Sequence, residues 1–121
     1  WLKYSKGRNA KPNKPEKFLS KILEPLDFKY VGNYKVWIDR KNPDFINEEE
    51  KKIIEFFGWY HTFEYRSKYE NDLASDREHE EERINHFKKF GYETIIIWEK
   101  DLKNIEELKN RIKNFAGDKN V

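Results

Sequence analysis

The spacing of apolar residues changes several times along the chain, and each change predicts a new element. Behind Pro15, apolar residues recur three and four positions apart from Phe18 to Leu26, which predicts an amphipathic helix that covers one face of a sheet. Strand-like segments separated by tight polar turns follow at 28–30, 34–38, 43–46 and 51–57. The last of these segments has the apolar character of a buried strand.

The second half of the chain opens with a polar, irregular stretch at 62–74, which we expect to form a loop. Ser75 and Glu78 then have the spacing of a capping box and predict a helix that stops at Gly91. The apolar stripe of this helix, extended toward its N-terminus at helical spacing, brings three polar side chains onto or beside the inward face: Asp76, Glu80 and Arg83. These side chains either line a site or belong to the solvated end of a charged helix.

The chain ends with a strand and a helix. The segment 92–98 is the clearest strand and is apolar enough to be central in a sheet. Asn104 and Glu107 form a second capping box, which opens a last amphipathic helix. This order predicts an α/β sandwich in which helices flank a small mixed sheet. We divide the chain into a basic linker or arm, a domain and a tail, at 1–14, 15–116 and 117–121.

Composition narrows the classes of function. The chain has 25 basic and 23 acidic side chains, so a DNA-binding surface must come from local clustering, for example in a basic arm along a phosphate backbone. The absence of cysteine excludes disulfides, thiolate zinc sites and cysteine nucleophiles. Without an apolar run of membrane-spanning length or a signal peptide, we expect a cytoplasmic protein with no membrane partner. The first residue is Trp1, which suggests a fragment that lacks an upstream domain.

Glu55 is the most informative residue of the predicted buried strand. An ionised carboxylate costs several kcal/mol to bury unless a cation or a donor compensates it, so Glu55 needs either a salt bridge or a metal ion. Asp44 lies in the preceding short strand, which a tight turn brings alongside. Carboxylates on neighbouring strand ends, with a main-chain carbonyl between them, form the hard oxygen site that Mg²⁺ or Mn²⁺ prefers.

His61 follows the same strand closely. Alone it is more often a surface imidazole, but beside these two carboxylates it is a candidate general base or a donor to a phosphate. Aromatic residues surround it in the sequence: Trp59, Tyr60 and Phe63. They serve either ordinary packing or as a wedge or stacking surface against bases.

Together these segments resemble the endonucleases related to the very-short-patch-repair mismatch enzyme. They resemble more closely a homing-endonuclease branch with an E-D-x-H-D signature. The resemblance covers the chain from Lys11 to Phe115, and its motifs are Pro43-Asp44, the run 54–61, Gly91-Tyr92 and the run 95–102. The branch belongs to the PD-(D/E)xK nuclease superfamily. The resemblance therefore implies a restriction-endonuclease-like αβββαβ core with an extra C-terminal helix.

The same resemblance implies a metal-dependent endonuclease that acts on double-stranded DNA. Asp44 would bind Mg²⁺, with Mn²⁺ able to substitute, and Glu55 would occupy the second acidic position and hold the metal together with Asp44. The main-chain carbonyl of Phe56 would be a further ligand. Glu16, at the start of the first helix, matches the first acidic residue of the signature.

The remaining signature positions are filled less regularly. His61 matches the histidine, and we assign the last acidic position to Asp76, with Glu80 as the alternative. Phe57 stands where the superfamily usually has a lysine. Stabilisation of the developing charge must therefore come from the histidine, a nearby Lys or Arg, or a second metal. The missing lysine also suggests an alternative, a catalytically silent DNA-binding module with the nuclease fold.

Overall fold

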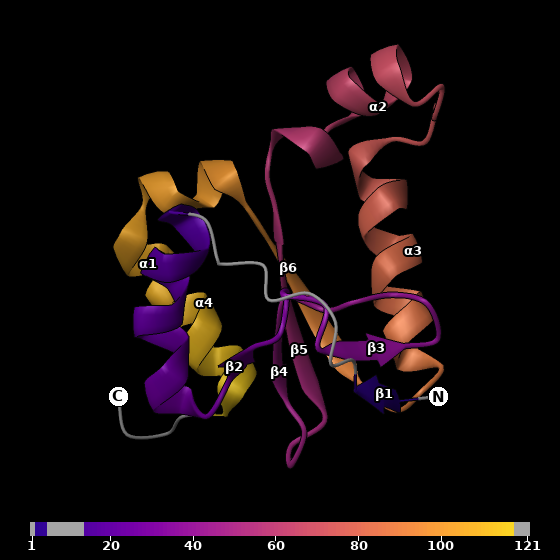
Figure 1. Ribbon diagram of the computed structural model, residues 1–121. Coiled ribbons are helices and arrows are strands. Elements are labelled where there is room, and N and C mark those ends of the chain that lie inside the picture. The colour runs from indigo at the N-terminus through magenta and orange to yellow at the C-terminus, as the bar shows by residue number, and fades with distance from the viewer. Residues whose placement is uncertain (1, 5–13, 118–121) are drawn as a thin grey trace.

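The computed structural model describes residues 2–4 and 14–117. A four-stranded mixed sheet lies at its centre, in the order β2 (Lys29–Tyr30), β4 (Phe45–Asn47), β5 (Lys52–Phe57) and β6 (Glu93–Trp98). The first three of these strands are antiparallel neighbours, whereas β5 and β6 are parallel. Figure 1 shows two helices on one face of the sheet, α1 (Lys14–Leu23) and α4 (Ile105–Ala116), and on the other face α3 (Asp76–Lys88). The predicted mixed sheet flanked by helices is confirmed.

Two apolar clusters hold the three layers together. Successive residues of a strand point to opposite faces of the sheet, and in β5 this directs Ile54 toward α1 and α4 and Ile53 toward α3. The first cluster contains Leu19, Leu23, Ile97, Leu108 and Ile112, among others. The second contains Val36, Ile38, Ile46, Phe87 and Tyr92, among others. The strand β5 is thus covered on both faces, as its apolar sequence predicts.

The segment between α1 and β4 differs from the prediction. Strands form within both 28–30 and 34–38, as β2 and β3 (Val36–Ile38), but they do not pair with each other. The amides of Val31 and Gly32 donate to the carbonyl of Asp44, at 2.7 and 3.1 Å, so the chain that leaves β2 stays beside β4 instead of turning back. A short helical turn, η1 (Glu24–Leu26), connects α1 to this segment.

Part of the predicted arm at 1–14 has regular structure. Residues 2–4 form β1 (Leu2–Tyr4), which pairs antiparallel with β3 in a separate small sheet. Residues 5–13, like the tail at 118–121, lie outside the described part of the chain. The first helix begins at Lys14, where the boundary between arm and domain was predicted.

The loop predicted at 62–74 is wrong in its first half. A helical turn, η2 (Trp59–His61), leads into α2 (Phe63–Tyr69), which projects beyond the end of the sheet in Figure 1. Thr62 caps α2, since its Oγ1 accepts a hydrogen bond from the amide of Tyr65 at 3.3 Å. The helix packs through Arg66, its one buried residue. A short helix without an apolar stripe has no periodicity to reveal it.

The central position predicted for 92–98 is also wrong. This segment forms β6, an edge strand of the sheet. It is apolar because helices cover both of its faces, and Arg111 of α4 donates to the carbonyl of Ile96 at 2.8 Å. The predicted helix ends are confirmed: Ser75 and Glu78 form a capping box, Gly91 follows α3 with φ +88°, and Asn104 caps α4.

Candidate active site at the carboxylate pair

The structure brings Asp44 and Glu55 together, as predicted. The antiparallel register pairs Phe45 with Ile54, so the residue before Phe45 lies opposite the residue after Ile54. The Asp44 amide donates to Glu55 Oε1 at 2.9 Å. In return, the amide of Phe56 donates to Asp44 Oδ2 at 2.8 Å. The two carboxylates are therefore held in place by each other's strand.

Burial sets the electrostatics of this pair. Glu55 is 1% exposed and Asp44 is half-buried. Burial raises the pKa of Asp44 well above its usual value, and the neighbouring charge of Glu55 raises it further. Burial also raises the pKa of Glu55, although Arg83 opposes the shift. Two adjacent carboxylates with raised pKa values form a site that an added cation would relieve.

Arg83 of α3 is the cation that Glu55 was expected to need. Its Nε donates to Glu55 Oε2 at 2.7 Å, and its Nη2 donates to the carbonyl of Asn42 at 2.9 Å. Both oxygens of Glu55 are therefore engaged. Among the described residues, Asp44 accepts hydrogen bonds through Oδ2 alone. The free acceptor of the pair is thus an oxygen of Asp44.

His61 forms a pair with a histidine that the sequence analysis missed. Its Nδ1 lies 3.0 Å from Nε2 of His79. The His61 ring stacks on Phe57 with the centroids 4.0 Å apart and the planes 4° from parallel, and the His79 ring packs on Phe57 with the centroids 5.0 Å apart. The spacing of His79 four residues before Arg83 and eight before Phe87, on the inward side of α3, is the signal that could have revealed it.

The environment of His61 keeps its ring neutral near pH 7. Burial, together with the charges of His79, Arg83 and Arg66, lowers its pKa to about 4. Burial also lowers the pKa of His79. In a neutral pair, one ring nitrogen donates its hydrogen to the other, which fixes the tautomer and orientation of both rings. The charge of Arg83 lowers the pKa of both His61 and Asp44, so this arginine acts on both parts of the site.

Glu16, the predicted first acidic residue, lies near the pair. It accepts a hydrogen bond from the hydroxyl of Tyr30 at 3.3 Å, and its charge contributes to the raised pKa of Asp44. Burial and the charge of Glu16 together raise the pKa of Tyr30 above its usual value. The first helix therefore contributes a third acidic side chain at this end of the sheet.

The two acids considered for the last signature position support other elements. Asp76 Oδ1 accepts from the amide of Phe63 at 2.6 Å and from Arg66 at 3.2 Å. Glu80 accepts from Trp98 Nε1 at 2.5 Å. Since Nε of Arg66 donates to the carbonyl of His61 at 2.8 Å, Asp76 is linked to His61 through this arginine. These contacts make Asp76 part of the support of η2 and α2.

The donor set at the pair fits one small, hard cation. In a β-strand the N–H and C=O groups of one residue point to the same side. The carbonyl of Phe56 therefore faces Asp44, because its amide does. Within residues 2–4 and 14–117, no group of three or more His, Cys, Asp or Glu side chains gathers as a metal site. Mg²⁺ commonly uses one or two carboxylates and completes its shell with water and substrate phosphate, and Asp44 with this carbonyl meets that requirement.

Comparisons with known proteins identify no relative: no family model, no curated protein and no solved structure matches the chain. Across the described residues, none of the helices combines the length and the apolar character that crossing a membrane requires.

Proposed function

We propose that this chain is a Mg²⁺-dependent DNA endonuclease domain, in which Mn²⁺ can replace Mg²⁺, that hydrolyses phosphodiester bonds of duplex DNA. The observation that carries the proposal is the meeting of Asp44 and Glu55 at adjoining strand ends, with Arg83 and His61 at the same edge of the sheet. Carboxylates, a fixed cation and a neutral imidazole are the groups that metal-assisted phosphodiester hydrolysis uses.

Each group has a distinct role in this proposal. Asp44 and the carbonyl of Phe56 would hold the ion, which supplies polarisation of the phosphate and activation of water. Arg83 contributes the positive charge that the missing lysine would otherwise provide at the scissile phosphate. His61 is neutral and can accept a proton, and His79 orients it. Glu16 acts from the outer shell.

The fold supports the same proposal. When β1, β3, α2 and the short helical turns are left out, the elements α1, β2, β4, β5, α3 and β6 occur in the order of a restriction-endonuclease-like αβββαβ core, and α4 would be the extra C-terminal helix. The small sheet β1–β3 is an addition to that order. Glu55 lies in the second half of β5, and α2 projects from that end of the strand (Figure 1).

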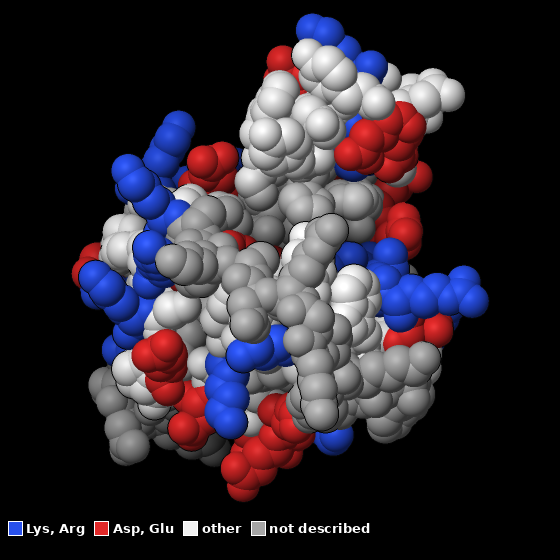
Figure 2. Space-filling model, in the orientation of Figure 1, with Lys and Arg blue, Asp and Glu red and all other residues white. Residues whose placement is uncertain are grey.

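The surface around this end suits a nucleic acid. In Figure 2, Lys and Arg side chains gather on the flank formed by α1 and the short helix η3 (Glu99–Lys103). On the projecting side, aromatic side chains pack against one another while remaining exposed: Trp59 by 46%, Tyr60 by 66% and Tyr69 by 58%. Exposed aromatic rings beside a candidate cleavage site favour stacking on bases over a purely structural role.

The test is cleavage of supercoiled and linear duplex DNA with Mg²⁺ or Mn²⁺, with single strands and RNA as comparison substrates. We expect Asp44→Asn and His61→Ala to slow cleavage by about 100-fold or more. Glu81→Gln, at an exposed acid of α3, is the matched control and should cleave normally. If folded protein cuts no nucleic acid with either metal, or if both variants cut as fast as wild type, the proposal is wrong.

One observation favours a second function, a catalytically silent DNA-binding module. Arg83 already neutralises Glu55, and Phe57 occupies the usual lysine position. A silent module would bind DNA with a steep dependence on salt but would show no response to Mg²⁺ at Asp44 and Glu55. Titration of the metal, followed through the amide resonances of these two residues, separates the two functions.

A further inference from the structure

A cavity of about 820 Å³ lies next to His61, at the carboxyl ends of the two parallel strands. Phe57 and Trp98 are the last residues of β5 and β6, are aligned in register, and both line the cavity. In open α/β sheets, ligands bind beyond the carboxyl ends of parallel strands. The cavity also has the size of small-molecule sites, about 300–1,000 Å³.

The walls of this cavity are aromatic and fixed. The rings of Phe57 and Trp98 meet at 87° with their centroids 5.1 Å apart. The indole N–H of Trp98 donates to Glu80 at 2.5 Å, which holds the ring plane in place. Trp59 lines another part of the cavity and is 46% exposed. Such walls suit a planar ligand that stacks.

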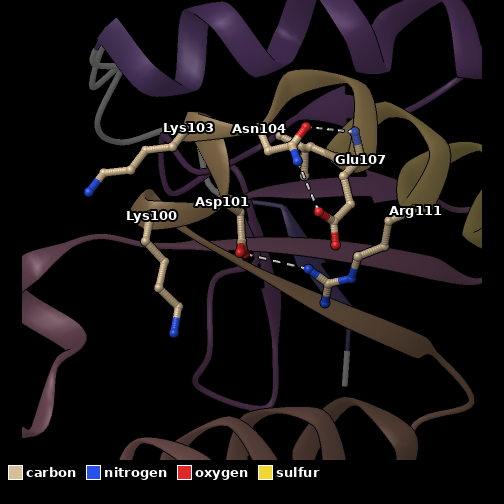
Figure 3. A pocket seen from close by; sticks show the side chains of 7 residues that line it. Lys100, Asp101, Lys103, Asn104, Glu107 and Arg111 are labelled. Carbon is tan, nitrogen blue, oxygen red and sulfur yellow. Dashed lines mark hydrogen bonds and ion pairs between the residues drawn. The ribbon is translucent and has the colours of Figure 1, made fainter.

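Charged groups in the lining suit a phosphate and an amino group. Lys100, Lys103 and Arg77 line the cavity. Figure 3 looks into the neighbouring hollow between η3 and α4, where Asp101 pairs with Arg111; both lysines extend away from that pair. Glu99 also lines the cavity and offers hydrogen-bond acceptors.

We propose that this cavity binds one nucleotide of the DNA, turned out of the helix, with an amino-bearing base such as adenine against Trp98. Its phosphate lies near Lys100 and Lys103. The inference rests on the proposed function, because it assumes a DNA substrate at the adjacent carboxylate pair. Turning a base out of a duplex costs free energy and therefore weakens binding, unless the base is already unpaired. We therefore expect a duplex with one unpaired adenine to bind about tenfold more tightly than a fully paired duplex.

Gly58 allows the cavity to be filled without straining the backbone. Its φ of −89° and ψ of −165° are accessible to any residue. A Cβ at this position would meet the Phe56 ring at 3.7 Å and Glu99 Oε2 at 3.9 Å, which are ordinary contacts. Gly58→Leu should extend into the cavity, whereas Gly58→Ala is the matched control that adds only the Cβ. Thermal unfolding shows whether both variants keep the fold.

The affinities of the two duplexes are measured without divalent metal, so that nothing is cut. Wild type and Gly58→Ala should prefer the unpaired adenine about tenfold, and Gly58→Leu should bind both duplexes equally. A duplex with an unpaired thymine in the same place should show a smaller preference. Equal binding of both duplexes by wild type, or an unchanged preference in Gly58→Leu, would overturn the proposal.

A free nucleotide provides an independent measurement. Addition of dAMP should shift the indole N–H resonance of Trp98, assigned through Trp98→Phe, more strongly than dTMP or inorganic phosphate. Lys103→Glu should weaken this response, which covers the case in which Gly58→Leu does not fold. No shift with dAMP overturns the cavity assignment.

The nuclease proposal is tested separately. If no DNA is cut but the preference for the unpaired adenine persists, the nuclease proposal fails and the nucleotide site stands.

Discussion

Arg83 sets the electrostatic environment of the carboxylate pair. Arg83 belongs to α3, which covers one face of the sheet. Its Nε donates to Glu55 at 2.7 Å, while its side chain is 21% exposed. Arg83 opposes the rise that burial causes in the pKa of Glu55, whereas the neighbouring charge of Glu55 adds to the rise in the pKa of Asp44. The two acids, which look equivalent in sequence, therefore differ in electrostatic environment and in the ligand oxygen each can offer.

Removal of Arg83 should be costly because it leaves a buried charge without a partner. We expect Arg83→Met to lower the free energy of unfolding by about 3–5 kcal/mol at pH 7, measured by urea denaturation. Adding Glu55→Gln should recover much of this loss. Arg77→Met is the control, because its ion pair with Glu81 is exposed and should be worth less than about 1 kcal/mol. An Arg83→Met variant as stable as wild type would contradict the compensating role.

The lowered pKa of His61 predicts a dependence of stability on pH. The folded pKa is about 4, against an ordinary value of 6.5, so between these values the unfolded chain binds more protons. This contribution is complete above pH 6.5 and is lost as the pH falls toward 4. It amounts to at most about 3 kcal/mol.

The raised pKa values of Asp44 and Glu55 act with the opposite sign, because their contribution to stability is lost as the pH rises. The measurement is therefore a difference between variants. The free energy of unfolding of wild type and of His61→Asn is compared at pH 7.5 and at pH 5. Wild type should lose more stability on acidification than the variant; equal losses would show that His61 titrates normally.

At the residue scale, the carboxylate pair could be predicted from the sequence, whereas the histidine pair was missed. The contact between Asp44 and Glu55 could be predicted because a short turn between two strands allows few pairing registers. His79 was missed because the extended stripe of α3 was assigned to Asp76, Glu80 and Arg83, although His79 lies four residues before Arg83 on the same side of the helix. Its partner, His61, directly precedes the segment 62–74, which was predicted to be a loop.

Among the elements, α2 depends on a single buried side chain. Arg66 donates to the carbonyls of His61 and Ala74 and pairs with Asp72 and Asp76. It thereby connects η2, α2, the segment that follows and the start of α3. These contacts are polar and join distant residues, so no local pattern in the sequence could predict them.

Loss of this arginine should loosen α2 before it unfolds the sheet. In Arg66→Met, we expect the amides of α2 to exchange hydrogen at least about tenfold faster, while those of β5 keep most of their protection. Lys68→Met, at an exposed position of the same helix, is the control. Because Arg66 holds the carbonyl of His61, the proposed nuclease activity should fall in the first variant and not in the second. Equal exchange in both variants would contradict the role of Arg66.

The pairing partners of β2, β3 and β6 could not be predicted from the sequence. Strand character was predicted correctly at β2 and β3, but the choice of partner depends on the backbone near Asp44, which takes the amides of Val31 and Gly32. The edge position of β6 was missed for a related reason. Burial on both faces by helices makes a strand apolar whether or not it has two neighbours.

At the scale of the whole molecule, the fold places its chemistry at one end of the sheet. Two apolar clusters stabilise the layers, while the carboxylate pair, the histidine pair and the 820 Å³ cavity lie where β5 ends. The core and the helices α1, α3 and α4 could be predicted from periodicity and capping. The inward face of α3 could be predicted too, but which of its polar side chains contact the carboxylate pair could not, because that depends on the packing of long side chains between layers.

Metal binding should appear as a gain in global stability, because an ion that binds only the folded state shifts the unfolding equilibrium. At ten times its dissociation constant, Mg²⁺ should add about 1.4 kcal/mol and raise the Tm by about 5 °C. Asp44→Asn should remove this shift. Glu55→Gln should retain most of it, because both Glu55 oxygens are already engaged by Arg83 and the Asp44 amide.

The same thermal measurement separates two arrangements of the site. If Glu55→Gln loses the Mg²⁺ shift as fully as Asp44→Asn, both carboxylates bind the ion and Arg83 must leave Glu55 to admit it. If Mg²⁺ and Mn²⁺ raise the Tm of neither wild type nor Glu55→Gln, the pair binds no divalent ion. Arg83 would then be its permanent counter-ion, which is the arrangement expected of a silent module.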